Sequence, residues 1–164
     1  MSNPSQPDRA NTGSDARLVQ ILLVEDSPAD VELTRQALLD AKVANDISVV
    51  GDGEAAMDFV RRNGPYGDAP RPDLILLDLN LPKKDGREVL VELKDDPDLR
   101  RIPVVVLTTS ALDEDIAQAY DHYVNSYVRK PVRLEAFLQA VSSIEDYWLA
   151  VVSLPPDTAP TPKG

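Results

Sequence analysis

The chain has 164 residues, 43% of them apolar and 27% charged, which fits one globular domain with a real core. It contains no cysteine and a single histidine, so disulfide scaffolds, thiol catalysis and multi-histidine metal sites are excluded. The formal net charge is −11, and all of it falls between two electrically neutral ends, 1–17 and 150–164. Because no basic footprint is present, we expect no nucleic-acid partner, and a cation or a basic face of another protein fits better.

Both ends of the chain are predicted to be tails. Residues 1–17 are rich in Ser, Pro, Asn, Asp and Gly without hydrophobic periodicity, and residues 155–164 are rich in proline. Neither segment can bury enough apolar surface to offset the entropy of ordering. The first tail lacks the apolar stretch of a secretory signal, and no window has the ~20 apolar residues of a membrane helix. We therefore expect a cytoplasmic protein with no membrane partner.

Between the tails, apolar strands alternate with amphipathic helices. The first expected strand, 18–24, is followed by a helix that Ser27 caps and Pro28 begins. Three of the strands are continuous apolar runs, as expected when both faces of a sheet are covered. Five strand–helix pairs predict an α/β fold, with a parallel sheet and helices on both sides. The other expected strands are 47–50, 74–77, 104–107 and 126–129, and the other expected helices are 54–63, 86–95, 112–121 and 133–148.

The residues directly after the strands are the informative ones, because ligands bind beyond the carboxyl ends of parallel strands. The first strand ends at Glu25-Asp26, the third at Asp78, the fourth at Thr108 and the fifth at Lys130. Three converging carboxylates repel one another unless a cation joins them, and Mg²⁺ prefers oxygen ligands. A carboxylate can also attack phosphorus, and a hydroxyl and an ammonium can stabilise the transferring group. The joint pattern predicts a phosphoryl-accepting site, although each residue alone has an ordinary structural explanation.

Further motifs accompany these strand ends: Leu81-Pro82 and Asp85-Gly86 follow Asp78, and Tyr127-Val128-Arg129-Lys130-Pro131 surrounds the end of the fifth strand. Together with Glu25-Asp26, Asp78 and Thr108, they resemble the receiver domain of two-component response regulators. The resemblance covers about residues 18–148 and implies a doubly wound, flavodoxin-like, five-stranded parallel sheet with strand order 2-1-3-4-5. It implies that Asp78 is the phosphoacceptor and that Glu25 and Asp26 are the acidic Mg²⁺ pair.

The same resemblance assigns the other site residues. Asn80 matches the position that gives a backbone carbonyl to the metal, and Asp78 is itself a metal ligand in this scheme. Thr108 and Tyr127 match the switch pair, and Lys130 matches the phosphoryl-binding lysine. Receivers commonly have a cis peptide at the position of Lys130–Pro131. The residue after the switch threonine, usually Ala or Gly, is Thr109 here, and its branched side chain could narrow access to the acceptor.

A finer resemblance links the chain to response regulators that pair with phytochrome histidine kinases. It rests on the insertion 63–72, the run Thr108-Thr109-Ser110 and the ending Tyr147-Trp148-Leu149. It implies a histidine kinase of the phytochrome type as partner. Because only about 15 residues follow the last expected helix, this sequence has no room for an output domain, and we expect the receiver itself to contact a target protein.

Two other functions remain open from the residues. A haloacid-dehalogenase-like phosphatase also uses an Asp nucleophile and Mg²⁺, but it needs Asp-x-Asp after the first strand, where this chain has Glu25-Asp26. A degenerate receiver would act only as an interaction module, and its usual sign, a missing acid or lysine, is not seen. We therefore expect a signalling protein rather than an enzyme.

The segment after the last expected helix predicts a homodimer. Residues 147–154 are apolar on nearly every side, and such a segment cannot be covered by its own domain as one helical face can. A second copy is the simplest partner, and the phytochrome-partner resemblance implies pairing through the face of the fourth helix, fifth strand and fifth helix. The alternative is that residues 149–154, within a C-terminal extension 149–164, fold back over their own domain.

Overall fold

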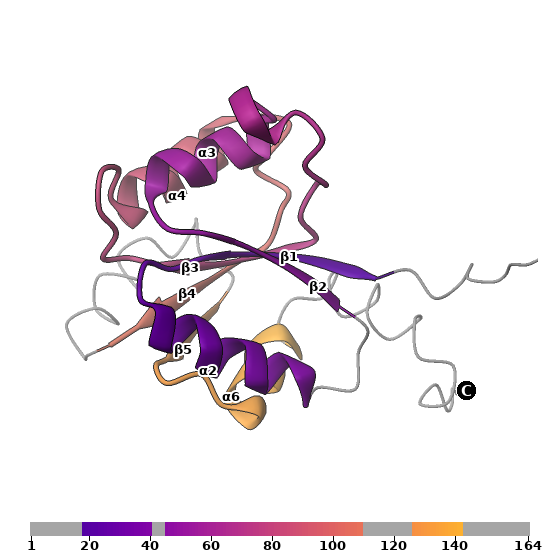
Figure 1. The fold of residues 1–164 in the computed structure, drawn as a ribbon, viewed down its shortest axis with the longest axis vertical. Helices are drawn as coiled ribbons and strands as arrows, with labels where there is room; N and C mark the ends of the chain where they lie inside the picture. The colour runs from indigo at the N-terminus through magenta and orange to yellow at the C-terminus, as the bar shows by residue number, and fades with distance from the viewer. Residues whose placement is uncertain (1–17, 41–44, 110–125, 143–164) are drawn as a thin grey trace, which may run out of the picture.

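A computed structural model of the protein describes residues 18–40, 45–109 and 126–142. These residues contain one five-stranded sheet with the order β2-β1-β3-β4-β5, and every neighbouring pair is parallel (Figure 1). This confirms the predicted fold class and strand order. The strands are β1 (Val19–Val24), β2 (Asn45–Val50), β3 (Leu74–Asp78), β4 (Val104–Thr108) and β5 (Ser126–Arg129).

Helices cover both faces of the sheet. Helices α3 and α4 lie on one face, and α2 and α6 lie on the other (Figure 1). The predicted helix 112–121, the part of the last helix beyond residue 142, and both predicted tails lie outside the described residues. The helices are α2 (Pro28–Leu39), α3 (Gly53–Arg61), α4 (Gly86–Asp95) and α6 (Leu134–Ser142), and a short 3-10 helix, η2, spans Gly64–Tyr66.

Side-chain caps begin three of these helices close to the strand ends. Ser27 caps α2 and accepts a hydrogen bond from the backbone N–H of Asp30. Asp52 caps α3, and Asp85 caps α4 in a reciprocal capping box with Glu88. Because each cap satisfies backbone donors that the first turn leaves free, α2 and α3 can begin within a few residues of the preceding strand, while a longer loop separates β3 from α4.

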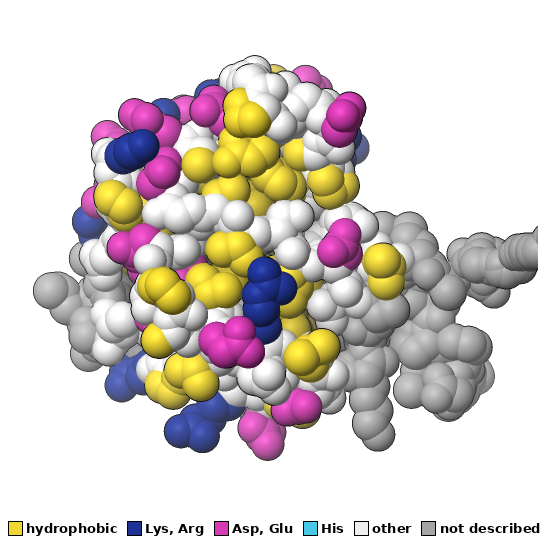
Figure 2. Space-filling model, viewed as in Figure 1, with side chains coloured by type: hydrophobic (Ala, Val, Ile, Leu, Met, Phe, Trp, Pro, Cys, Tyr) yellow, Lys and Arg dark blue, Asp and Glu magenta, His cyan; other side chains and the backbone are white. Residues whose placement is uncertain are grey.

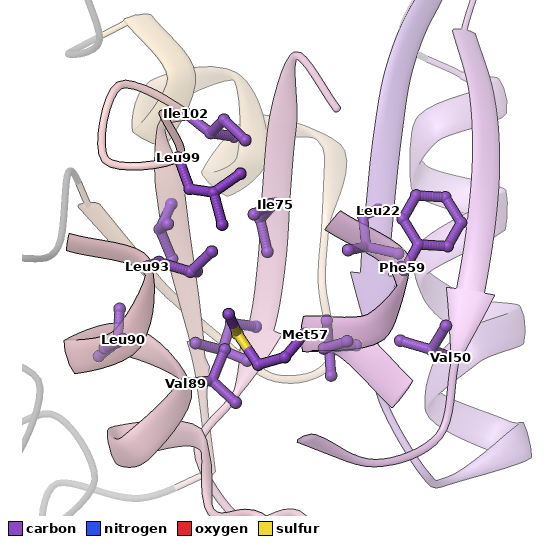
Figure 3. Packing of buried hydrophobic residues seen from close by; sticks show 14 of the residues in the cluster. Leu22, Val50, Met57, Phe59, Ile75, Val89, Leu90, Leu93, Leu99 and Ile102 are labelled. Carbon is purple, nitrogen blue, oxygen red and sulfur yellow. The ribbon is translucent and has the colours of Figure 1, made fainter. Parts of the chain in front are cut away.

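The core consists of two layers, one on each face of the sheet. In β1, Leu22 packs among residues of α3 and α4, whereas Leu23 packs on the opposite side with residues of α2 and α6. Figure 3 shows the first layer, in which Met57 of α3 and Leu93 of α4 meet the side chains of the sheet. Every residue of β3 and β4 is buried. Polar side chains therefore emerge where these strands end.

Most boundaries lie within one residue of the sequence prediction, and three features differ by more than that. Strand β2 begins at Asn45 rather than at residue 47, because it pairs along the whole of β1. Helix α3 ends at Arg61 rather than at residue 63, because Arg62 adopts a left-handed conformation with φ 58°. Within the insertion 63–72, η2 was not predicted, and the ring of its Tyr66 lies 5.5 Å from that of Phe59.

The surface carries mixed charge. On the face shown in Figure 2, Lys and Arg side chains are scattered among acidic ones. None of the helices within residues 18–40, 45–109 and 126–142 combines the length and apolar character needed to cross a membrane.

Candidate functional site

Four strand ends bring polar side chains to one edge of the sheet. Glu25 directly follows β1, Asp78 is the last residue of β3, Thr108 is the last residue of β4, and Lys130 directly follows β5. Glu25, Asp78 and Thr108 are buried, with at most 3% of each residue exposed. Burying polar groups is costly unless they are paired, so this edge requires specific partners.

Lys130 connects these acids. Its ammonium Nζ lies 3.0 Å from Glu25 Oε1, 3.0 Å from Asp30 Oδ2 and 3.3 Å from Asp78 Oδ2. The lysine side chain is 8% exposed, and those of Glu25 and Asp78 are 0% and 4% exposed. The peptide bond between Lys130 and Pro131 is cis, which confirms the expectation from the family. The ammonium is thus held over the carboxylate that ends the central strand.

The acids form a cluster that suits a hard divalent cation. Glu25, Asp26 and Asp78 each offer a carboxylate oxygen, and these oxygens lie within 4.8 Å of one another. Asp26 is exposed, so the cluster is open to water on one side. An all-oxygen donor set with one open side fits Mg²⁺ or Mn²⁺, which bind few carboxylates and keep several waters.

The three carboxylates of the cluster carry more negative charge than the single ammonium of Lys130 can balance. Burial, together with the charge of Asp78, raises the pKa of Glu25 to about 7, against the lowering effect of its contact with Lys130. Burial by itself disfavours the ammonium of Lys130. Its hydrogen bonds to Asp30 and Glu25 outweigh this effect and raise the pKa of Lys130 above its usual range. Lys130 therefore stays charged, whereas Glu25 retains part of its proton near neutral pH.

The predicted switch pair lies beside this cluster. The hydroxyl of Thr108 donates to the carbonyl oxygen of Val128 at 3.5 Å, so in this structure it faces β5. Tyr127 stands opposite Val106 in the β4–β5 register, and 38% of it is exposed. Thr109 is also exposed. The structure therefore brings Glu25, Asp78 and Lys130 into direct contact, whereas the hydroxyl of Thr108 is directed toward Val128.

The loop after β3 is tightly packed around the acceptor. The backbone N–H of Asn80 donates to Asp78 Oδ1 at 3.0 Å, and that of Gly86 donates to the carbonyl oxygen of Leu79 at 3.1 Å. A Cβ on Gly86 would lie 2.5 Å from the carbonyl oxygen of Asp78. Gly53, at the start of α3, is even closer to this loop, because a Cβ there would lie 1.9 Å from the carbonyl oxygen of Lys84.

Sequence reasoning did not identify Asp30 as part of the site. Asp30 lies in the first turn of α2, where an acid is commonly found because it interacts favourably with the helix dipole. The position is one helical turn beyond the acidic pair at the end of β1, which was the available signal. The contact itself joins residues 100 positions apart and depends on the tertiary fold.

Fold and site together define a receiver domain, and the comparisons agree. Residues 21–142 match the family model of the response regulator receiver domain, so the chain belongs to this family. This confirms the resemblance carried by the motifs.

The similar proteins include phytochrome response regulators. Response regulator Rcp1 of Synechocystis sp. is 51% identical over 82% of this chain and 92% of its own length. Its Mn²⁺-bound structure covers 88% of this chain and 99% of that chain, with 47% identity and a TM-score of 0.65. The structure of the phosphorylated cyanobacterial phytochrome response regulator RcpA covers 88% and 100%, with 49% identity and a TM-score of 0.67. The bacteriophytochrome response regulator AtBRR covers 79% and 94%, with 43% identity and a TM-score of 0.74.

Proposed function

We propose that this receiver accepts a phosphoryl group on Asp78 from a histidine kinase, with Mg²⁺ as the metal. The observation that carries the proposal is the contact of Lys130 with Asp78 beside the cluster of Glu25, Asp26 and Asp78. These groups are a nucleophile, a cation-binding set and a fixed positive charge, which phosphoryl transfer to a carboxylate needs. Several similar solved structures are of phytochrome or bacteriophytochrome response regulators, one of them phosphorylated, which supports a kinase of the phytochrome type.

In the proposed reaction, a carboxylate oxygen of Asp78 forms a bond to phosphorus. The bond between phosphorus and the nitrogen of the donor histidine breaks, and that nitrogen keeps the electron pair. Glu25, Asp26 and the backbone carbonyl of Asn80 would hold the metal together with Asp78. When bound, the metal supplies positive charge for the phosphoryl oxygens. Lys130 donates to those oxygens from the opposite side.

The output of the proposed reaction is a change in a protein-interaction face. A phosphoryl group adds roughly −1.5 to −2 charge and three strong acceptor oxygens. We expect the hydroxyl of Thr108 to turn toward it and Tyr127 to fill the vacated space, which alters the face formed by β5 and its neighbours. The protein would act in the cytoplasm, where an ATP-using kinase supplies the group, and as a homodimer through this face and the C-terminal extension 149–164.

The test is direct labelling of the full chain. The protein is incubated with acetyl phosphate and Mg²⁺ and examined by intact mass. We expect one phosphoryl adduct that is lost on removal of Mg²⁺ and absent from Asp78→Asn, because an amide is not a competent nucleophile. Asp95→Asn, the same change at an exposed position at the end of α4, is the matched control and should label normally.

Other outcomes point to the alternative functions. Equal labelling of Asp78→Asn at a single site would contradict the assignment of the acceptor. Steady turnover of phosphate esters without an adduct would indicate a phosphatase. Neither an adduct nor turnover would indicate a receiver that works without phosphorylation.

A further inference from the structure

Asp30 is the acid of the site that neither the motifs nor the comparisons assign. It lies in the first turn of α2, and its carboxylate is 3.0 Å from the ammonium of Lys130, as close as the carboxylate of Glu25. Among the described residues, the acids whose oxygens gather into a cation-binding cluster are Glu25, Asp26 and Asp78, without Asp30. Asp30 therefore contacts the lysine from outside the metal-binding set.

All three N–H donors of the Lys130 ammonium have a carboxylate partner. A lysine carries three N–H donors, and the three carboxylates of Glu25, Asp30 and Asp78 surround Nζ at hydrogen-bond distance. The contact with Asp78 is the longest of the three, at 3.3 Å. This is also the carboxylate that becomes an acyl phosphate in the proposed reaction, so this donor is the one that passes to a phosphoryl oxygen. The other two contacts then hold the ammonium in place.

Of these two contacts, the one between Glu25 and Lys130 is the one that metal binding would weaken. It belongs to the proposed metal-binding set, so a bound cation draws on the same carboxylate that holds Lys130. Asp30 has no such competing role. Its backbone is fixed on both sides, because its N–H donates to Ser27 Oγ and its carbonyl accepts from the buried hydroxyl of Thr34. Helix α2 therefore presents Asp30 to the lysine from a rigid position.

We propose that Asp30 is a positioning residue that holds the ammonium of Lys130 over Asp78 and thereby sets the rate of phosphoryl transfer. This inference rests on the proposed function for the rate, whereas the positioning can be observed without any phosphorylation. A residue that merely favours the helix dipole would contribute to the stability of α2 and leave both the lysine and the rate unchanged.

Three variants separate these roles. Asp30→Ala removes both the charge and the acceptor. Asp30→Asn keeps an oxygen that can accept from the ammonium. Glu32→Ala is the matched control, because Glu32 is an exposed acid two residues along the same helix that accepts a hydrogen bond from Gln36. All three are measured as full chains, and thermal unfolding reports any effect on the fold.

The first measurement is the side-chain ammonium spectrum of ¹⁵N-labelled protein, with the Lys130 signal assigned by its loss in Lys130→Arg. Protons of a buried, hydrogen-bonded ammonium exchange slowly with water and give an observable signal. We expect this signal in the unaltered protein and in Glu32→Ala, its loss in Asp30→Ala and its return in Asp30→Asn.

The second measurement is the labelling rate with acetyl phosphate and Mg²⁺. We expect a fall of roughly tenfold in Asp30→Ala, the size of one charge-assisted hydrogen bond, with most of the rate restored in Asp30→Asn.

An Asp30→Ala protein that keeps the Lys130 signal, or that loses the signal but labels at the unaltered rate, would overturn the inference. An equal fall in Glu32→Ala would do the same, because it would trace the effect to helix charge. Failure of the proposed function is distinguishable: the unaltered protein would then take no phosphoryl group, while the ammonium spectra still separated Asp30→Ala from Glu32→Ala.

Discussion

Glu25 couples metal binding to pH. It is 2% exposed, and its burial and the neighbouring charge of Asp78 raise its pKa from 4.5 to about 7. A carboxyl whose pKa is higher in the folded state stabilises that state fully below the unfolded pKa, and this stabilisation is lost as the pH rises through about 7. A divalent cation needs the deprotonated form, so it binds where the metal-free site is least stable.

We therefore predict that Mg²⁺ affinity falls as the pH is lowered below about 7. Each pH unit should cost roughly a factor of ten while a proton competes with the metal. Titration of the protein with Mg²⁺ at pH 6 and pH 8, or the rise in melting temperature at fixed Mg²⁺, measures this. In Glu25→Gln the affinity should be low and nearly independent of pH over this range. Equal affinities of the unaltered protein at both pH values would contradict the prediction.

At the scale of elements, the start of α3 holds the acceptor loop in place. Gly53 lies so close to the loop after β3 that a Cβ would collide with the backbone of Lys84, and Lys83 of the same loop adopts φ 64°. We predict that Gly53→Ala destabilises the fold by about 1–3 kcal/mol, because the helix and the loop must separate. Divalent-cation affinity should also fall, because this loop begins at Asp78 and contains Asn80.

Gly51→Ala is the matched control, since no atom lies within 4 Å of its added Cβ. It should stay within about 0.5 kcal/mol of the unaltered protein. Urea unfolding and a Mn²⁺ titration measure the two effects. Unchanged stability and metal affinity in Gly53→Ala would show that the loop can move without cost.

A second element-scale prediction concerns β4 and β5. After phosphorylation, the amide signals of residues 104–109 and 126–131 should shift, because the hydroxyl of Thr108 exchanges the carbonyl of Val128 for a phosphoryl oxygen. Thr108→Val keeps the shape of the side chain but removes the donor. This variant should still be labelled, with much smaller shifts in β5. Identical spectra of the free and phosphorylated protein over these residues would refute the switch.

The elements were predictable from sequence where local signals are strong. The bounds of α4 and β5 match the prediction, because a capping box and a short apolar run flanked by polar residues are visible in the chain itself. The residues that end β1, β3, β4 and β5 were identified because the carboxyl ends of parallel strands meet at one edge. The start of β2 depends on its pairing with β1, and the contact between Gly53 and Lys84 depends on how two elements pack. Such features follow from the tertiary structure and have no local signature.

At the scale of the whole molecule, the apolar C-terminal sequence requires a surface that covers it. Residues 147–154 lie outside the described residues, and their composition is apolar on nearly every side. Strand β5 is an edge of the sheet, and its Tyr127 is 38% exposed, so the adjoining face has apolar surface of its own to offer a second copy. A symmetric pair would bury both surfaces at once.

We predict that the full chain is a dimer at micromolar concentration and that truncation after Asp146 makes it a monomer, because the truncation removes the apolar segment. Truncation after Leu154 is the matched control. It removes only the proline-rich end, so the dimer should persist. Because each copy carries a net charge of −11, the dimer should also weaken at low ionic strength, where repulsion between the copies is least screened. Light scattering of the three chains at two salt concentrations measures these effects. A monomeric full chain would instead favour a segment that folds back over its own domain, and a dimer that survives the first truncation would move the interface to another face.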